Sequence, residues 1–127
     1  MDKFRNAVSW FEIPARDIKR AKAFYEAIFD TTLQEMNLAN NLKMALFPAE
    51  AGTIGGALCE HSDFYHPGPQ GPLVYLNANP DLQKVLDRLK TKNAKIVVPK
   101  TQISPEIGYM GVFEDSEGNR VALMSRA

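Results

Sequence analysis

The sequence predicts an α+β fold built from two consecutive βαβββ modules. The first observation is that two segments with helical spacing of apolar residues each follow a short strand-like segment. The second is that each helical segment is followed by three short apolar segments typical of strands. The third is an internal repeat, because Trp10 matches Tyr75 at an offset of 65 residues and Asp17 matches Asp81 at an offset of 64.

The first module begins with a predicted strand over 7–13 that ends at Pro14. Asp17 is a suitable N-cap for a helix over 18–29, since its short side chain can accept a hydrogen bond from the first helical turn. The apolar positions of this helix are Ile18, Ala21, Phe24, Tyr25 and Ile28. Three strands are predicted over 33–38, 42–47 and 54–59, with turns at Asn40-Asn41 and Ala51-Gly52.

A loop over 60–72 joins the modules, because it contains three prolines and two glycines. The second module is predicted as a strand over 73–78 and a helix capped by Asp81, with Leu82, Val85, Leu86 and Leu89 on one face. Strands over 94–99, 109–114 and 119–125 follow, and Gly118 suits the turn DSEGN. We therefore expect one domain over 1–127, with modules at 1–62 and 70–127.

Composition excludes several classes of protein. The 15 basic residues balance the 15 acidic residues, so the chain has no overall charge that would attract nucleic acid or an anionic membrane. Cys59 is the single cysteine, which rules out an internal disulfide and favours a reducing compartment. The opening MDKFRNAV lacks an apolar signal core, and no apolar stretch reaches membrane-spanning length. The predicted location is the cytoplasm.

The first strand has two chemically different faces. Side chains alternate along a strand, so Phe11 and Ile13 share one face, which is typical of a core. The other face places Trp10, the single tryptophan, beside the carboxylate of Glu12. A carboxylate beside an aromatic ring is unusual for a dry core, so this face is a candidate binding surface.

Several motifs resemble the vicinal oxygen chelate superfamily, which includes glyoxalase I, bleomycin-resistance proteins and extradiol dioxygenases. They are Asp17 seven residues before Phe24-Tyr25, the segment GYMGVFEDSEGNRVALMS over 108–125, and the doubled βαβββ pattern. The segments WFEIPARDIKRAKAFYEAIF, GPLVYLN and VPKTQI are closer to a largely uncharacterised glyoxalase-like subgroup. The resemblance implies that each module curls into a half-barrel around a cavity, with the helices on the convex side.

The resemblance also implies a set of cavity residues. Trp10 and Glu12 are expected to face the cavity, with Tyr75 and Asn77 on the matching wall. Alternation adds further residues from the last strand of each module, which are Ala57, Cys59, Arg120, Ala122 and Met124. Phe113 is expected to join Trp10, Tyr75 and Met124 in a pocket for an apolar or planar ligand, although the same side chains would also serve simply to fill a small barrel.

The metal-binding positions of the superfamily fall on residues that are unsuited to a metal. They are Trp10, Ala57, Tyr75 and Ala122, where metal-dependent members have His, Glu or Gln. We therefore expect no metal and no other cofactor. An alternative is a cluster of Glu60, His61, Asp63 and His66 in the loop over 60–72, which is otherwise a solvated polar loop.

The leading hypothesis is a metal-independent, glyoxalase-like protein that forms a symmetric homodimer and binds a small organic ligand in its cavity. A second hypothesis is a lyase or isomerase related to lactoylglutathione lyase, with Glu12 as general base. The alternatives for these residues are that Glu12 pairs with Arg120 or accepts hydrogen bonds from Asn77, and that Arg120 binds a substrate carboxylate or phosphate. The third hypothesis is a non-catalytic interaction protein whose barrel is filled by its own side chains.

Overall fold

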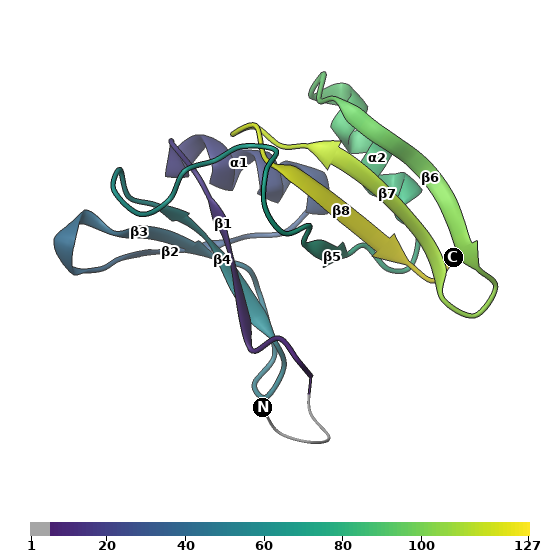
Figure 1. The fold of residues 1–127 in the computed structure, drawn as a ribbon, viewed down its shortest axis with the longest axis horizontal. Coiled ribbons are helices and arrows are strands. Elements are labelled where there is room, and N and C mark those ends of the chain that lie inside the picture. The colour runs from purple at the N-terminus through teal and green to yellow at the C-terminus, as the bar shows by residue number, and fades with distance from the viewer. Residues whose placement is uncertain (1–5) are drawn as a thin grey trace.

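Two four-stranded sheets with the same strand order make up the computed structural model, which describes residues 6–127. The first sheet has the order β1-β4-β3-β2 and the second has the order β5-β8-β7-β6 (Figure 1). The elements are β1 (Trp10–Pro14), α1 (Ile18–Phe29), β2 (Gln34–Asn37), a 3-10 helix (Ala39–Asn41), β3 (Lys43–Leu46), β4 (Gly55–Glu60), β5 (Tyr75–Asn77), α2 (Gln83–Thr91), β6 (Ile96–Ser104), β7 (Gly108–Glu114) and β8 (Arg120–Ser125). The opening MDKFR lies outside the described residues.

Each sheet begins with a parallel pair and continues with antiparallel pairs. Strand β1 pairs in parallel with β4, and β5 pairs in parallel with β8. The other neighbours in each sheet are antiparallel. A parallel pair requires a long crossover, which the helix and the two intervening strands of each module provide. The α+β fold of two βαβββ modules that the sequence predicts is confirmed.

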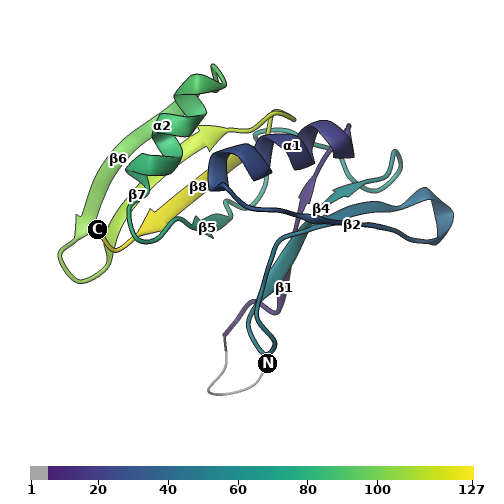
Figure 2. The ribbon, with the colours of Figure 1, turned by 180° about the vertical axis from the view of Figure 1, so that it is seen from behind.

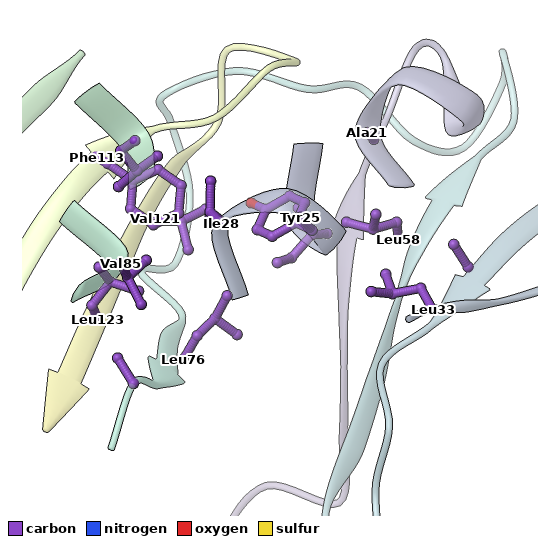
Figure 3. Packing of buried hydrophobic residues seen from close by; sticks show 14 of the residues in the cluster. Ala21, Tyr25, Ile28, Leu33, Leu58, Leu76, Val85, Phe113, Val121 and Leu123 are labelled. Carbon is purple, nitrogen blue, oxygen red and sulfur yellow. The ribbon is translucent and has the colours of Figure 1, made fainter. Parts of the chain in front are cut away.

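Both helices cover the same side of the two sheets, and helix α1 lies where the modules meet (Figures 1 and 2). Tyr25 and Ile28 of α1 are fully buried in a core cluster that spans both modules. In Figure 3 these two side chains lie between Leu58 of the first sheet and Val121 of the second. The apolar stripe of α1 therefore joins the helix-covered faces of both sheets into one continuous core.

The start of α1 agrees with the sequence prediction, whereas the start of α2 does not. The side chain of Asp17 accepts a hydrogen bond from the backbone N–H of Arg20 and caps α1. Leu82 is the N-cap of α2, so the prediction that Asp81 occupies this position was wrong by one residue. Asp81 Oδ1 still accepts a hydrogen bond from Gln83 N at 2.9 Å and from Lys100 Nζ at 2.8 Å. Asp81 therefore stabilises the first turn of α2 from just outside the helix.

Two strands of the second module differ in length from the prediction. Strand β5 has three residues, and β6 continues to Ser104, beyond the predicted end at position 99. Pro99 lies within β6, which is possible because β6 pairs with no described strand except β7 and is therefore an edge strand. The pairing of β6 with β7 contains register shifts, and such irregularities break the simple alternation that sequence analysis relies on.

The turn between β7 and β8 fastens the second module to the start of α1. Glu117 Oε1 accepts hydrogen bonds from the backbone N–H groups of Arg16 and Asp17, and Arg20 forms an ion pair with the same carboxylate at 2.8 Å. Burial alone would raise the pKa of Glu117, but the hydrogen bonds from Arg20 and from the backbone outweigh it and lower this pKa to about 2. The turn that carries Gly118, at a φ of 86°, therefore also attaches the second module to the first turn of α1.

Candidate functional site

The face of the first sheet that points away from the helices carries the predicted carboxylate. Glu12 on β1 lies beside Ala57 on β4, and Met44 on β3 lies beside Cys59 on β4. Trp10 stands at the start of β1 and is 44% exposed. Ile13 is buried and Phe11 packs against the core cluster, so the two faces of β1 have the chemistry expected from alternation.

Glu12 is held by two hydrogen-bond donors. The indole Nε1 of Trp10 donates to Oε2 at 3.2 Å, and the hydroxyl of Tyr65 donates to Oε1 at 2.5 Å. Neither Arg120 nor Asn77 forms a hydrogen bond with Glu12 among residues 6–127, so that alternative for its partners was wrong; Asn77 Oδ1 accepts instead from Asn79 N. The two donors fix the direction in which the carboxylate points.

Tyr65 is the main residue of the site that sequence reasoning missed. It comes from the connection between β4 and β5, and its ring packs against Met44, Ala57 and Cys59. The hydrogen bond to Glu12 and burial both raise the pKa of Tyr65, so its hydroxyl stays protonated and remains a donor. Tyr65 lies in an irregular loop that contains proline and glycine, so no periodic pattern in the sequence predicts that its side chain packs on the open face of the first sheet.

Cys59 lies beneath Tyr65 and is inaccessible. Its side chain is fully buried, and burial together with the nearby charge of Glu12 raises the pKa of the thiol to about 12. We expect no reaction of the folded protein with a disulfide reagent at mildly alkaline pH, and full reaction after unfolding in guanidinium chloride. Rapid labelling of the folded protein would show that Tyr65 does not cover the thiol.

The strand register corrects the predicted match between the two modules. Glu12 pairs with Ala57, and the equivalent pair in the second module is Tyr75 with Ala122. Tyr75 therefore corresponds to Glu12 and not to Trp10, and these two residues are 63 positions apart. Ala57 and Ala122, on the last strands of the two modules, are 65 positions apart, so the second module has two more residues between its first and last strands. Because the sequence comparison assumed a nearly constant offset, it matched Tyr75 of β5 to the wrong residue of β1.

Phe113 was wrongly assigned to the ligand pocket. Its side chain is fully buried on the helix-covered face of β7, where its ring centroid lies 6.3 Å from that of Tyr25. Met110 and Val112 are the β7 residues that pair with Met124 and Ala122, so they occupy the open face. Alternation along the strand requires Phe113 to point the other way.

A cavity of about 320 Å³ brings together Glu12 and Arg120, one from each module. His66 and Gln70 line it from the segment over 61–74 between β4 and β5, which we call the strap. Its remaining lining residues are mostly apolar, namely Ile13, Pro14, Pro72, Val74 and Val121, together with Gly68 and Asn119. Sequence reasoning predicted both Glu12 and Arg120, but assigned no binding role to Gln70 and considered His66 only as a metal ligand.

The strap is fastened at several points. Gly68 N donates to Asn119 Oδ1 at 3.0 Å, and the guanidinium of Arg16 donates to the carbonyl oxygen of Pro67 at 3.4 Å. The hydrogen bond from Tyr65 to Glu12 adds a third attachment. The cavity wall formed by the strap is therefore part of the folded structure.

The remaining predicted residues do not converge on this cavity. Tyr75 is 45% exposed at the start of β5, and Asn77 pairs with Met124. Asn77 instead lines a larger groove of about 570 Å³ between the modules, together with Phe11 and Leu76 from the helix-covered faces.

The residues at the expected ligand positions do not fit a metal ion. The strand register moves the first of these positions from Trp10 to Glu12, whose two carboxylate oxygens already accept hydrogen bonds from Trp10 and Tyr65. The methyl groups of Ala57 and Ala122 offer no donor, and Tyr75 offers only a phenol. In the strap, His61 Nδ1 accepts a hydrogen bond from Asp63 N, whereas Glu60 at the end of β4 accepts one from Ile18 N through Oε1, so these groups point to separate partners. Across residues 6–127, no three side chains of His, Cys, Asp or Glu gather as a metal would require.

The chain belongs to the Glyoxalase/Bleomycin resistance protein/Dioxygenase superfamily, whose sequence model matches residues 7–123. No curated protein is significantly similar in sequence. None of the helices within residues 6–127 is both long enough and apolar enough to cross a membrane.

Solved structures of low sequence identity share the fold. A glyoxylase/bleomycin resistance protein/dioxygenase domain from Frankia sp. EAN1pec is 18% identical with a TM-score of 0.72, and the match covers 95% of this chain and 98% of that one. TnmS3, an antibiotic-binding protein from Streptomyces sp. CB03234, is 20% identical with a TM-score of 0.70 and coverages of 99% and 100%. A glyoxalase I mutant from Zea mays is 17% identical with a TM-score of 0.68, and the match covers 94% of this chain and 45% of that one.

Proposed function

We propose that this protein binds a small organic molecule, without a metal, in the cavity between Glu12 and Arg120. The observation that carries the proposal is the cavity of about 320 Å³, in which two opposite charges from different modules share a largely apolar lining. Concave sites of this kind, mostly apolar with a few polar groups, are typical of small-molecule binding. The antibiotic-binding function of TnmS3, which has the same fold, supports ligand binding as the class of function.

The hydrogen bonds made by Glu12 favour binding over catalysis. Both of its carboxylate oxygens already accept a hydrogen bond, from Trp10 and from Tyr65. A general base must turn a lone pair toward the proton of the substrate, and the two donors fix the direction of the carboxylate even though each oxygen keeps a second lone pair. A lyase or isomerase remains the second candidate, because the hydroxyl of Tyr65 at 2.5 Å gives Glu12 a partner for proton transfer.

The two candidates are separated by titrating the protein with a panel of antibiotics and small metabolites in the presence of a chelator. The signal is the indole N–H resonance of Trp10, which is unambiguous because the chain has one tryptophan. The proposal expects saturable shifts with a ligand from the panel and no turnover of it. Turnover of a bound compound that is lost in Glu12→Gln while binding is kept would establish the lyase instead.

The purified protein is expected to contain no tightly bound metal ion, because of the residues at the four ligand positions. By the strand register the four positions hold Glu12, Ala57, Tyr75 and Ala122, and one carboxylate with one phenol is too small a donor set for a divalent ion. Elemental analysis of purified protein should therefore find far less than one ion per chain. About one zinc, nickel, iron or manganese ion held per chain through extensive dialysis would contradict this expectation.

Self-association is expected because both sheets have open edges. Among residues 6–127, the outer strands β1 and β2 of the first sheet and β5 and β6 of the second each pair with a single neighbour, which leaves one backbone edge of each without a strand partner. Exposed edges of this kind are normally covered, and a two-fold dimer is the commonest way to cover them. Light scattering should give about twice the chain mass of 14.2 kDa at micromolar concentration. A mass equal to that of one chain across this range would count against the dimer.

A further inference from the structure

The charges in the cavity point to a particular class of ligand, an inference that rests on the proposed binding function. Glu12 and Arg120 line the same cavity, yet they form no ion pair with each other within 4.0 Å. The Arg120 guanidinium also makes no hydrogen bond or ion pair with any other residue between 6 and 127, although Glu114 is its cross-strand neighbour. The cavity therefore holds two opposite charges that are kept apart.

The hydrogen bonds that Glu12 accepts explain why its carboxylate does not pair with Arg120. Trp10 and Tyr65 each hold one carboxylate oxygen, so Glu12 cannot swing freely toward the second module. A carboxylate nevertheless has about four lone-pair positions, so two acceptor positions remain for a ligand. None of the five N–H donors of the planar Arg120 guanidinium is bonded to another residue in the described part of the chain, 6–127, and their fork geometry matches a carboxylate.

We propose that the cavity recognises a small amphoteric acid, such as an amino acid or an amine-bearing acid, whose carboxylate binds Arg120 and whose ammonium group binds Glu12. A ligand with both charges is matched on both sides of the cavity, because its carboxylate meets the Arg120 guanidinium and its ammonium group meets the lone pairs of Glu12 that Trp10 and Tyr65 leave free. A ligand with only an acid would leave Glu12 unmatched, and a ligand with only an amine would leave Arg120 unmatched. The apolar residues Ile13, Val74 and Val121 would contact the hydrocarbon part.

The test uses four compounds that share a phenyl group and carry both charged groups, the acid alone, the amine alone or neither. They are phenylalanine, 3-phenylpropionate, 2-phenylethylamine and 3-phenylpropanol, titrated against the Trp10 indole N–H resonance and by calorimetry. The proposal expects phenylalanine to bind most tightly. Arg120→Gln should weaken phenylalanine about 10- to 100-fold and leave 2-phenylethylamine unchanged, since it removes a charge-assisted hydrogen bond to the acid alone. Glu12→Gln should weaken phenylalanine and leave 3-phenylpropionate unchanged.

Arg126→Gln and Glu106→Gln are the matched controls, because both residues are exposed and neither lines the cavity. They change the net charge by the same amounts as the test variants and should leave every affinity unaltered. Circular dichroism and a thermal melt on each variant would separate a lost contact from a lost fold.

The other outcomes overturn the inference, and they show whether the proposed binding function fails with it. Equal affinity for all four compounds would show that charge does not select the ligand, while small-molecule binding itself would stand. Failure of all four, with a neutral member of the antibiotic panel bound at Trp10, would refute the amphoteric class and retain the proposed function. Failure of the four compounds and of the whole panel would refute both.

Discussion

Replacement of Phe113 by alanine is expected to lower the free energy of unfolding by about 3–5 kcal/mol, the range for removing a fully buried aromatic side chain. The ring of Phe113 is completely buried against α1, with its centroid 6.3 Å from those of both Phe24 and Tyr25. Removing it leaves a cavity at the point where the second sheet meets α1. Chemical denaturation of the two proteins measures the difference.

Phe64→Ala is the matched control, because the same side chain is 75% exposed in the strap. Exposed substitutions usually change stability by about 0.5 kcal/mol or less, so this variant should unfold almost as the parent does. If Phe113→Ala were as mild as Phe64→Ala, Phe113 would not belong to the core. A pocket-lining role would then return for this residue.

Glu117→Gln should lower stability by about 2–4 kcal/mol, because several hydrogen bonds to a charged acceptor are lost or weakened together. The Glu117 carboxylate binds the backbone N–H groups of Arg16 and Asp17 and the guanidinium of Arg20. An amide can accept at only one position and presents N–H donors where the carboxylate accepted. The start of α1 and its attachment to the second module should loosen together.

The effect of this substitution should depend on pH. The folded pKa of Glu117 is about 2, against an ordinary value of 4.5. A lowered folded pKa means that the stabilisation is fully present above pH 4.5 and is lost as the pH falls toward 2. The stability difference between the parent and Glu117→Gln should therefore shrink across this window. Asp115, whose pKa is raised by burial, titrates in the opposite sense but does so in both proteins.

Glu35→Gln provides the control for this series. Glu35 forms an ion pair with Lys19 of α1 at 3.0 Å, but the lysine side chain is 78% exposed. Surface ion pairs contribute about 0–1 kcal/mol, so this variant should be nearly neutral at every pH. A pH-independent loss in Glu117→Gln would indicate that packing at the turn, rather than the charge, stabilises α1.

The fold was predictable because its local signals agree with its long-range arrangement. The spacing of Ile18, Ala21, Tyr25 and Ile28 defines the buried face of α1, and all four are buried. Asp17 marks the start of that helix through a hydrogen bond that depends only on local sequence. The repeat then implied the same topology for the second half, which the matching strand orders confirm.

The errors arose where distant contacts decide the structure. A two-residue difference between the modules shifted Tyr75 away from the position of Trp10, and only the pairing with Ala122 shows this. Phe113 was assigned by its aromatic character, although alternation along β7 points it to the core. Asp81 resembles a helix cap in sequence, but it lies one residue too early and also forms an ion pair with Lys100.

The sequence was sufficient to predict the charged residues of the candidate site, but not the contacts that the strap makes with them. Glu12 and Arg120 stand out in sequence because each is the single charged residue of a strand in which most residues are apolar. The hydrogen bond from Tyr65 to Glu12 joins residues 53 positions apart, and Tyr65 lies in a loop without regular structure. No periodic pattern predicts such a contact, since it depends on the path of the strap over the first sheet.

A crystal structure of the protein with a ligand identified by the titration tests the central claim most directly. The account predicts that the ligand occupies the cavity of about 320 Å³, with polar atoms against Glu12 and Arg120 and no metal ion between ligand and protein. A ligand found instead in the groove of about 570 Å³, against Phe11 and Leu76 on the helix-covered side, would contradict it.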